Sequence, residues 1–594
     1  MIRKEEKEKP MTYKIKIVSH NETITAQEND LLADKIQDAG IDLSVYCNKK
    51  GLCGKCFVEI LEGKLPALDE KEEFLLKHKR LNKNFRLSCL YTIKSDLSIK
   101  IPDESIIHET YILTSGIKSV VSVNPAVKKY NLQIKKPEIP SPDSLQDLFL
   151  IHFKDKNLSI PLSLLKDLGE TLDQGKFNVT AVVHKGNEIL NIEPYNTLEH
   201  NFGIAIDIGT TTVVVELVDL NTGEIVDTLT EMNSQVKYGA DVVSRIGFAF
   251  SDPKNLDELR RSILETLNKM IKQILSKNKI DSSYVYEIVA AGNTSMNHFL
   301  LGMPVHSLAV APYSAVFTCL PELSSNDLGF KINKYGKVYV APNIKSFIGG
   351  DVSSGLLASD FANKKGNCLF IDLGTNGEIV LKTKDTIVAT STAAGPAFEG
   401  MNISCGMLAL PGAIYKAEYK KQLKTFTIRE KPASGICGTG LIDLFAIFLE
   451  EGKISPKGVI QGKRKKILIT NNIFITQKDV REMQLAIAAI KTGIKMILQE
   501  NSLTKDQLDG IYIAGAFGNY LNIKNSIRIG LLPQIGEEKI IFIGNSSLAG
   551  AKALLLSAKS RKETEALVKK IQYLSLALNP MFQKNFIDAL EFGG

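Results

Sequence analysis

Two stretches of this chain place an aspartate, a glycine and hydroxyl side chains where a buried strand is expected to end. The first is FGIAIDIGTTTVVVELV at residues 202–218, and the second is CLFIDLGTNGEIVL at residues 368–381. Each pattern predicts a β-strand that turns tightly at Asp-x-Gly-Thr and returns as a second strand. Such a hairpin can bind phosphate, because its glycine lets backbone N–H groups approach an anion and its threonines add hydroxyl donors.

The two hairpins supply the candidate residues of a phosphate site. Asp207 and Asp372 stand at the predicted strand ends and would meet phosphate through Mg²⁺, since a bare carboxylate repels it. One such hairpin is a weak signal because aspartate and glycine are ordinary turn residues, but two copies on similar strands rarely arise by chance. The other candidate residues of the two turns are Gly209, Thr210, Thr211, Thr212, Gly374, Thr375, Asn376 and Gly377.

Two further features follow the second turn. Glu378 would either orient an attacking water or be a solvated strand residue, and the sequence leaves both readings open. The small, glycine-rich stretch ATSTAAGPAFEGM at residues 389–401 predicts a loop outside the core. Thr390, Ser391 and Thr392 would place three hydroxyls in that loop.

Four cysteines near the start of the chain have the spacing of a metal centre. Cys47, Cys53 and Cys56 follow the pattern C-x5-C-x2-C, and Cys89 comes later as a fourth ligand. The pattern favours a [2Fe-2S] cluster over structural zinc, because zinc sites usually pair two C-x2-C arms. The first gap is one residue longer than in plant-type ferredoxins and resembles the adrenodoxin branch of the β-grasp family. The remaining cysteines, expected to be buried thiols, are Cys319, Cys368, Cys405 and Cys437.

The patterns around these sites predict a multidomain α/β protein. Residues 1–102 predict a β-grasp ferredoxin-like domain, with strands at 13–18, 22–26, 57–61 and 97–101 and a helix at 31–39. Residues 103–119 predict a linker, and residues 120–198 a small α/β middle domain that carries no chemistry. We interpret that domain as a spacer between cluster and nucleotide. Residues 199–594 hold both hairpins and are expected to form the nucleotide domain.

Glycine-rich turns repeat through the nucleotide domain. In IYIAGAFGN at residues 511–519, Gly515, Ala516 and Gly518 follow a strand and are candidates to approach an adenosine. Neither a P-loop nor a dinucleotide fingerprint is present in the sequence. Two phosphate hairpins followed by such turns resemble the acetate and sugar kinase, Hsc70 and actin superfamily. The resemblance implies a duplicated RNase H-like fold that binds ATP.

Composition limits the classes of partner. The 594 residues are 44% hydrophobic, and 73 basic against 66 acidic residues give a net charge of +7 without a basic stripe that would indicate nucleic acid. No apolar run reaches the roughly 18 residues that a membrane helix needs. The beginning, MIRKEEKEKP, lacks the apolar core of a signal peptide. We therefore expect a cytoplasmic protein that binds neither nucleic acid nor membrane.

The combination of an iron-sulfur domain with an actin-like ATPase domain resembles the ATP-dependent reductive activators of corrinoid proteins. The motifs that carry the resemblance are the cysteine loop, YGADVVSRI at 238, AGNTSMNHFLLG at 291, IGGDVSSGL at 348, STAAGPAFEG at 391, GICGTGLIDL at 435 and GNSSLAGA at 544. With no cysteine after Cys437, the chain is similar to the ferredoxin-type branch.

The resemblance implies that an electron passes from the cluster to Co(II) in a corrinoid protein of a methyltransferase system, which regenerates Co(I). It also implies a low-potential electron donor, and a homodimer is a candidate assembly. We expect closure of the ATPase halves to press the 389–401 loop, with Ser391, against the corrinoid and to weaken the axial ligand of cobalt. Two alternatives stay open at this point: a small-molecule kinase with a redox-sensing domain, and an ATP-driven chaperone-like binding protein.

Overall fold

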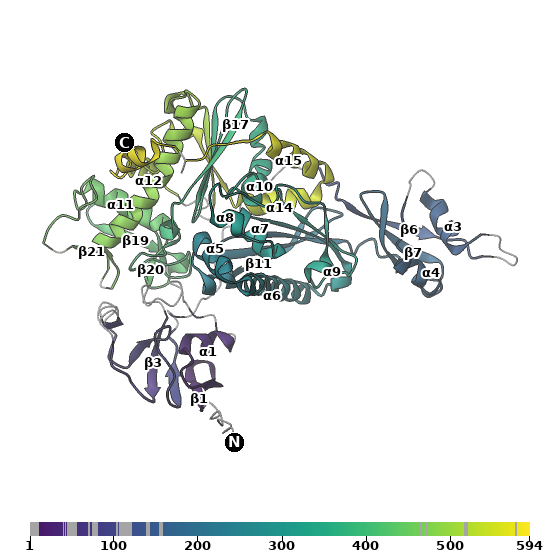
Figure 1. The fold of residues 1–594 in the computed structure, drawn as a ribbon, viewed down its shortest axis with the longest axis horizontal. Helices are drawn as coiled ribbons and strands as arrows, with labels where there is room; N and C mark the ends of the chain where they lie inside the picture. The colour runs from purple at the N-terminus through teal and green to yellow at the C-terminus, as the bar shows by residue number, and fades with distance from the viewer. Residues whose placement is uncertain are drawn as a thin grey trace, which may run out of the picture.

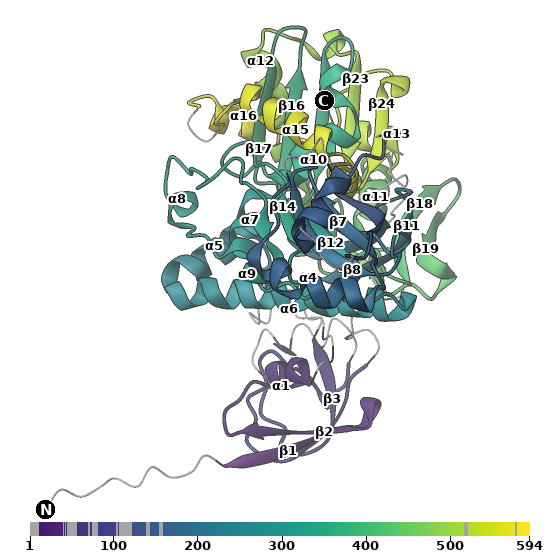
Figure 2. The same cartoon turned by 90° about the vertical axis from the view of Figure 1, so that its right-hand side faces the viewer.

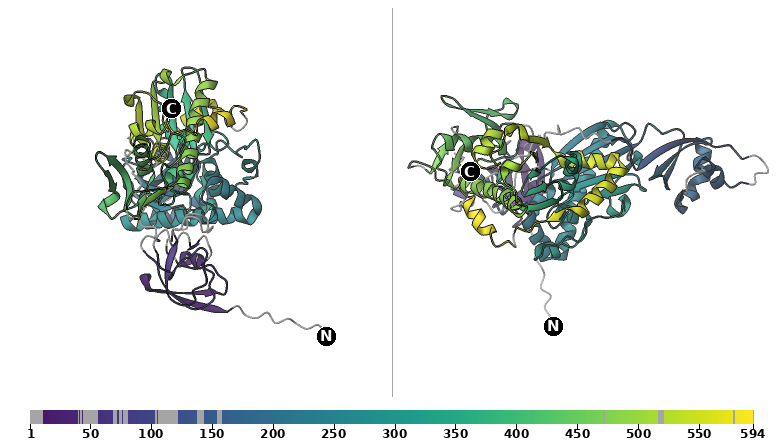
Figure 3. Two further views of the ribbon diagram at one scale, coloured as in Figure 1. Left: turned by 90° about the vertical axis from the view of Figure 1, so that its left-hand side faces the viewer. Right: turned by 90° about the horizontal axis from the view of Figure 1, so that it is seen from above.

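The fold was analysed in a computed structural model of the chain. The structure describes residues 11–39, 41, 43, 56–68, 72–73, 76, 81–102, 105, 122–137, 143–153, 158–463, 465–470, 472–515, 521–576 and 579–593. In Figure 1 the N-terminal domain lies below a large central body, and a second small domain projects to the right of that body. Figures 2 and 3 show the N-terminal domain on the side of the body that carries the long helix α6 (Pro253–Asn278).

Within its described residues, the N-terminal domain shows a five-stranded sheet with the helix α1 packed on it. The strands lie in the order β2-β1-β5-β3-β4. Ile15 and Ile17 point from β1 into a core that also takes Leu32 and Ile36 from the helix. The predicted β-grasp elements are confirmed, and the additional strand β4 was not predicted. The elements are β1 (Thr12–Ile17), β2 (Glu22–Gln27), α1 (Leu32–Asp38), β3 (Phe57–Glu62), β4 (Phe85–Leu87) and β5 (Leu97–Lys100).

The projecting domain is a three-stranded antiparallel sheet covered by two helices. Its strands lie in the order β6-β7-β8. Leu164, Leu168 and Leu172 recur along one face of α4 and bury that face against the sheet. The predicted linker at residues 103–119 falls almost wholly outside the described residues. The elements are β6 (Val127–Gln133), α3 (Leu145–Leu150), α4 (Leu162–Gln174), β7 (Asn178–His184) and β8 (Glu188–Pro194).

The central body contains two six-stranded sheets that repeat one strand order. The first sheet runs β11-β10-β9-β12-β14-β13 and the second runs β24-β23-β15-β16-β17-β25. If the short strands β13 and β25 are left out and the second sheet is read from β17 to β24, the strands of each half, numbered along the chain, have the order 3-2-1-4-5. The duplicated RNase H-like fold is therefore confirmed. The strands are β9 (Phe202–Ile208), β10 (Thr212–Asp219), β11 (Ile225–Met232), β12 (Val285–Gly292), β13 (Leu323–Ser324), β14 (Lys337–Val340), β15 (Cys368–Leu373), β16 (Gly377–Lys382), β17 (Ile387–Thr392), β23 (Gly510–Ala514), β24 (Ile540–Gly544) and β25 (Gln572–Tyr573).

Helices separate and cover the two sheets. Two of them, α10 and α14, pack against each other and lie between the halves, with α14 against β9 and β12 of the first sheet. Gly550 and Ser354 make this approach close, because a Cβ at Gly550 would lie 2.0 Å from the carbonyl oxygen of Ser354. The helices are α5 (Val242–Ser251), α6, α7 (Thr294–Leu301), α8 (His306–Ala309), α9 (Ser325–Leu328), α10 (Gly350–Ala358), α11 (Gly438–Glu450), α12 (Gln477–Glu500), α13 (Ile523–Arg528), α14 (Ser546–Leu556), α15 (Ala558–Lys570) and α16 (Phe582–Asp588).

Smaller strands and the chain end complete the second half. A three-stranded sheet has the order β19-β18-β20, and β21 pairs with β22. Two further described helices, α15 and α16, follow α14 along the chain. Among the helices that the structure describes, none has the length and apolar character needed to cross a bilayer. The strands are β18 (Ala413–Tyr419), β19 (Leu423–Thr427), β20 (Gly435–Ile436), β21 (Lys466–Leu468) and β22 (Phe474–Thr476).

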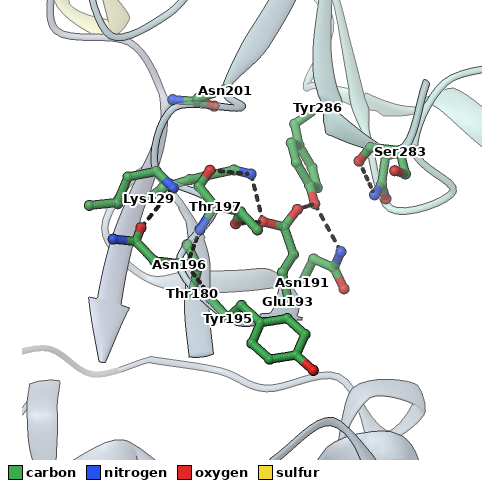
Figure 4. Close-up of polar contacts among 12 residues, drawn as sticks. Lys129, Thr180, Asn191, Glu193, Tyr195, Asn196, Thr197, Asn201, Ser283 and Tyr286 are labelled. Atoms are coloured by element: carbon green, nitrogen blue, oxygen red, sulfur yellow. Dashed lines mark hydrogen bonds and ion pairs between the residues drawn. The ribbon is translucent and has the colours of Figure 1, made fainter. Parts of the chain in front are cut away.

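A buried polar cluster joins the projecting domain to the first sheet of the body. Figure 4 shows Glu193 of β8 at its centre, where Lys129 approaches to 2.6 Å and the hydroxyls of Thr197 and Tyr286 both donate to its carboxylate. Asn191 donates to the Tyr286 hydroxyl at 2.8 Å. Removing one partner from such a buried network leaves the others without hydrogen bonds. The cluster therefore fixes the projecting domain on β12.

Candidate functional site

Both predicted hairpins open onto one cavity of about 490 Å³ between the two sheets of the central body. The first hairpin joins β9 to β10 and the second joins β15 to β16. The cavity also reaches the start of α11, at Gly438 and Thr439, and the turn before α14, at Asn545. The predicted residues that line it are Asp207, Gly209, Thr210, Thr211, Thr212, Asp372, Gly374, Thr375, Asn376, Glu378 and Gly515. The structure thus brings together residues that lie far apart in the sequence.

Backbone hydrogen bonds hold both turns tight. The Gly209 N–H donates to the Thr212 carbonyl at 2.9 Å, and the Gly374 N–H donates to the Asn376 carbonyl at 3.0 Å. A Cβ at position 209 would lie 2.6 Å from the Thr212 carbonyl oxygen, so only glycine fits the first turn. The second turn has more room, because the nearest atom to a Cβ at Gly374 is 3.6 Å away. Both turns present backbone and hydroxyl donors to the cavity, which is the chemistry that phosphate binding requires.

Of the three residues predicted to approach an adenosine, the structure describes Gly515. Strand β23 ends at Ala514, and Gly515 has φ +110°, where a Cβ would lie 2.5 Å from the Leu373 carbonyl oxygen. Glycine is therefore required where this strand passes the second hairpin. Gly377 opens β16 and packs so closely that a Cβ would meet Ile490 at 2.0 Å, so its role is in packing. Ala516 and Gly518 lie outside the described residues.

Several carboxyl groups converge on the cavity. Asp372 stands opposite Glu378 in the β15–β16 register, and Asp351 at the start of α10 lines the same cavity. Burial raises the pKa of Asp372 to about 7, with repulsion from Asp207 adding to it. Burial, together with the charge of Asp372, raises the pKa of Asp351 to about 8. Carboxyl groups that raise one another's pKa have the donor chemistry of a divalent cation site.

Glu378 is buried, with 5% of its surface exposed. The reading as a solvated strand residue is therefore wrong. Burial first, and then the charges of Asp351 and Asp372, raise its pKa well above the usual value. A hydrogen bond from the Asn376 side chain opposes this rise. A carboxylate held in this way is suited to accept a proton from water.

Asp207 differs from the other carboxylates because its two oxygens are held by hydrogen bonds. The Asn545 amide donates to one at 2.9 Å and the Ser547 hydroxyl to the other at 2.7 Å. Burial raises its pKa, and these two hydrogen bonds oppose the rise. Asn545 and Ser547 were predicted only as part of a strand-to-helix turn. Their role at the cavity follows from the packing of α14 beside β9.

A carboxylate that the sequence analysis did not single out connects the two hairpins. Glu399 lies at the end of the short turn Pro396–Glu399 and accepts hydrogen bonds from Thr211 of the first hairpin and, at 2.6 Å, from Thr375 of the second. We call this arrangement the Glu399 bridge. Its one sequence signal was its place in the motif STAAGPAFEG. The residue type alone did not reveal that the turn would fold back between the hairpins.

Arg245 is a second residue that the sequence did not reveal. It is fully buried on α5, where it donates to the carbonyls of Gly239, at 2.8 Å, and of Thr210 behind the first hairpin. Burial lowers the pKa of Arg245 to about 9, while the charges of Asp241 and Glu399 oppose that change. A cation behind the first phosphate turn attracts anions into the cavity.

The stretch at 389–401 is not the outside loop that the sequence predicted. Its first part continues β17 to Thr392, and Phe398 is 2% exposed within the core. Thr390 donates to the Leu574 carbonyl at 2.8 Å and Thr392 to the Gly377 carbonyl at 3.2 Å, so neither hydroxyl is available to a partner. Ser391 is partly exposed and stands opposite Glu378 in the β16–β17 register. Alternating strand geometry, which the glycine-rich composition obscured, places Ser391 on the same face of the sheet as Glu378 and on the opposite face from Thr390 and Thr392.

The structure brings two of the predicted cluster ligands together. Cys56 precedes β3 and Cys89 follows β4, and the Ser88 N–H donates to the Cys56 carbonyl at 2.9 Å. The two thiols are 1% and 2% exposed. Two buried cysteines from distant segments, side by side at the end of a strand pair, fit cluster ligation. Cys47 and Cys53 lie outside the described residues.

The other cysteines divide into two groups. Cys368 and Cys437 are buried as predicted, with 2% and 4% of their surface exposed. Cys319 and Cys405 are only partly buried, so the prediction of a buried thiol was wrong for these two. His298 is a structural residue with both ring nitrogens satisfied: they contact the Thr294 carbonyl at 2.7 Å and the Val316 N–H at 3.1 Å.

Family models match consecutive parts of the chain. A model described as the 2Fe-2S iron-sulfur cluster binding domain matches residues 15–94. Models described as the RACo linker region and the RACo middle region match residues 116–199 and 202–364. A model described as the C-terminal domain of RACo, the ASKHA domain, matches residues 366–593.

Relatives match the chain over most of its length. The corrinoid activation enzyme RamQ of Eubacterium limosum is 32% identical over 602 residues, which cover 96% of this chain and 98% of RamQ. The [Co(II) methylated amine-specific corrinoid protein] reductase of Methanosarcina barkeri is 30% identical over 435 residues and covers 66% of this chain and 77% of the reductase. The solved structure of a reductive activator for corrinoid,iron-sulfur protein has 33% identity and a TM-score of 0.74, with 98% of both chains covered.

Proposed function

This chain belongs to the family of reductive activators of corrinoid proteins, and we propose that it uses ATP to reduce Co(II) to Co(I) in a partner corrinoid protein. The observation that carries this function is the end-to-end match to corrinoid activation enzymes, which includes both the cluster domain and the ATPase domain. It favours reductive activation over the kinase and chaperone-like alternatives. The physiological electron donor is expected to be a low-potential carrier, and a homodimer stays a prediction.

The energetics explain why ATP is needed. When bound, a [2Fe-2S] cluster of the plant type supplies single electrons at roughly −400 mV. Co(I) is a strong reductant, and each 59 mV or so by which a one-electron transfer is uphill costs a factor of ten in equilibrium. ATP can overcome this barrier only if it binds two conformations of the complex with different affinity. The cavity between the two halves of the body is the place where such a difference would arise.

We assign the nucleotide to this cavity by the chemistry of its donors. The two turns, with Thr210, Thr211, Thr212 and Thr375, would hold the phosphates, and Asp207 and Asp372 would hold Mg²⁺. Glu378 would accept the proton of the attacking water. Gly515 would let the backbone approach the nucleoside.

Mg²⁺ binding to the nucleotide-free protein is expected to strengthen as pH rises. Asp372 and Asp351, with pKa values of about 7 and 8, hold protons at low pH that Mg²⁺ must displace. We expect the affinity to be at least about tenfold weaker near pH 6 than near pH 8.5, measured by titration calorimetry. Equal affinity at both pH values would contradict the assignment of these carboxylates to the cation.

The same pKa shifts determine whether the free energy of unfolding rises or falls with pH in the absence of Mg²⁺. The folded-state pKa values lie above those of the unfolded chain, so the folded protein binds more protons between about pH 4 and 8. The protonated carboxyl groups therefore contribute to the free energy of unfolding below that pH range. This contribution is lost as pH rises through about 7 to 8. Thermal unfolding should therefore occur at lower temperature near pH 8.5 than near pH 6, and Mg²⁺ should restore more stability at the higher pH.

The direct test mixes the purified protein, with its cluster reconstituted, with a chemical reductant, Mg-ATP and a Co(II) corrinoid protein. Absorption of Co(I) is expected to appear with ATP and to stay near background with ADP. If ATP makes no difference with corrinoid partners of several methyltransferase systems, the proposed function is wrong.

Contact between β17 and the corrinoid is proposed for Ser391 alone, since it is partly exposed whereas Thr390 and Thr392 are buried. We expect Ser391→Ala to slow Co(I) formation while the ATP hydrolysis rate without partner stays unchanged. Thr386→Ser, an adjacent hydroxyl change in the turn before β17, is the control. An unchanged rate of Co(I) formation in Ser391→Ala would remove this residue from the partner site.

A further inference from the structure

The Glu399 bridge occupies the groups that the nucleotide itself requires. Its two donors, the hydroxyls of Thr211 and Thr375, belong to different hairpins on different sheets. Both hydroxyls line the cavity. A carboxylate and a phosphate are alike in presenting anionic oxygens to such donors. One side chain therefore holds the two phosphate turns together by the same contacts that a phosphate group would make.

The bridge has direct connections to the core of the second half. Phe398, next to Glu399, is 2% exposed, and the turn packs on both α11 and α12. Gly400 has φ +76°, and a Cβ there would lie 2.6 Å from the Met407 backbone. The backbone of the turn is thus tightly seated, so the Glu399 carboxylate can leave the hairpins by rotation of its own side chain or together with a shift of the turn. The same segment continues backward into Ser391 on β17.

We propose that Glu399 is a positioning residue that bridges the two hairpins when the nucleotide site is empty and gives up their hydroxyls to the terminal phosphate of ATP. This inference rests on the proposed function for its consequence, because release of Glu399 would leave the turn that follows β17, and with it the segment that carries Ser391, free to shift. ADP lacks the terminal phosphate and leaves the bridge in place. The bridge therefore distinguishes ATP from ADP by competition at Thr211 and Thr375.

Arg245 fits this exchange of anions. The guanidinium lies behind the first hairpin and is influenced by the charge of Glu399. In the nucleotide-free protein the Glu399 carboxylate supplies a negative charge to this region. An incoming phosphate would replace that charge, so the buried cation has an anionic neighbour in both states. Replacement of Glu399 by a phosphate therefore keeps a negative charge near Arg245, whereas removal of Glu399 alone does not.

The test compares the binding of two nucleotides to Glu399→Gln and Glu399→Ala in the full chain with its cluster reconstituted. A non-hydrolysable ATP analogue and ADP are each titrated calorimetrically in Mg²⁺ buffer without partner protein. Loss of the competing carboxylate should tighten binding of the ATP analogue by about tenfold while ADP changes by less than about twofold. Gln keeps a neutral acceptor, so its effect should lie between those of wild type and Ala. Glu224→Gln, an exposed glutamate on the turn between β10 and β11, is the matched control.

The outcomes separate this inference from the proposed function. A purely structural glutamate would weaken both nucleotides together, and an unchanged or lower preference for the ATP analogue in Glu399→Gln would overturn the proposal. Thermal unfolding of each variant verifies that it is folded. If Glu399→Ala is unstable, the near-isosteric Glu399→Gln variant decides the test. In the complete assay, Glu399→Ala should form Co(I) more slowly at saturating ATP. If the wild type forms no Co(I) at all, the proposed function fails while the affinity ratio still decides the role of Glu399.

Discussion

Cys89→Ser is expected to abolish ATP-dependent formation of Co(I) while ATP affinity stays within about twofold of the wild-type value. Cys89 is 2% exposed and lies beside Cys56 at the end of the β3–β4 pair. A serine hydroxyl has the size of the thiol but lacks the thiolate that binds iron. The nucleotide cavity lies in another domain and shares no residue with this pair. Visible absorption and electron paramagnetic resonance report the cluster, and calorimetry reports the nucleotide.

Cys319→Ser is the matched control for this experiment. Cys319 is partly buried in the central body, where burial raises the pKa of its thiol, and it has no connection to the cluster domain. The control should keep both the spectrum and the activity. Full Co(I) formation by Cys89→Ser would show that this cysteine is not an essential ligand. Loss of ATP binding together with the cluster would instead indicate that the domains fold as one unit.

Glu378→Gln is expected to lower ATP hydrolysis and Co(I) formation together, by about 10²- to 10⁴-fold, the range for loss of a general base. The amide keeps the shape of a side chain that is 5% exposed, so packing on Asp372 and Asp351 is retained. It cannot accept the proton of the attacking water. Affinity for a non-hydrolysable ATP analogue should therefore change by less than about tenfold. Phosphate release and Co(I) absorption, followed in the same samples, measure both reactions.

The two measurements also test whether hydrolysis or binding drives the electron transfer. If Glu378→Gln stops hydrolysis but forms one equivalent of Co(I) rapidly, ATP binding alone supplies the conformational change. If hydrolysis continues at the wild-type rate, Glu378 is not the base. Glu563→Gln, which changes an exposed glutamate paired with Lys559 on α15, is the control for the substitution itself.

Local patterns predicted the elements of the fold well, because each depends on residues close in the chain. The strands and turns predicted around Asp207 and Asp372 were correct, because each hairpin depends on apolar strand residues and a glycine-containing turn that are close together in the chain. Asp241 caps α5 as expected, with the Ser244 N–H donating to its carboxylate at 2.7 Å. The prediction that residues 389–401 form a loop outside the core was wrong, because small residues are as compatible with a buried strand as with a loop. There the pairing with β16 decided the outcome.

The sequence by itself determined which chemical groups this protein has: four cysteines at cluster spacing, two phosphate hairpins and the motifs of a corrinoid activator. These are properties of residue type and near-neighbour spacing. The tertiary structure alone decided that Glu378 is buried, that Ser391 is the partly exposed one of the three hydroxyl residues and that Glu399 joins Thr211 to Thr375. Burial and contact between distant segments depend on how sheets and helices pack, and no local pattern records them. The coupling that we propose between ATP and electron transfer belongs to this second class, because it depends on two hairpins on different sheets that both contact Glu399.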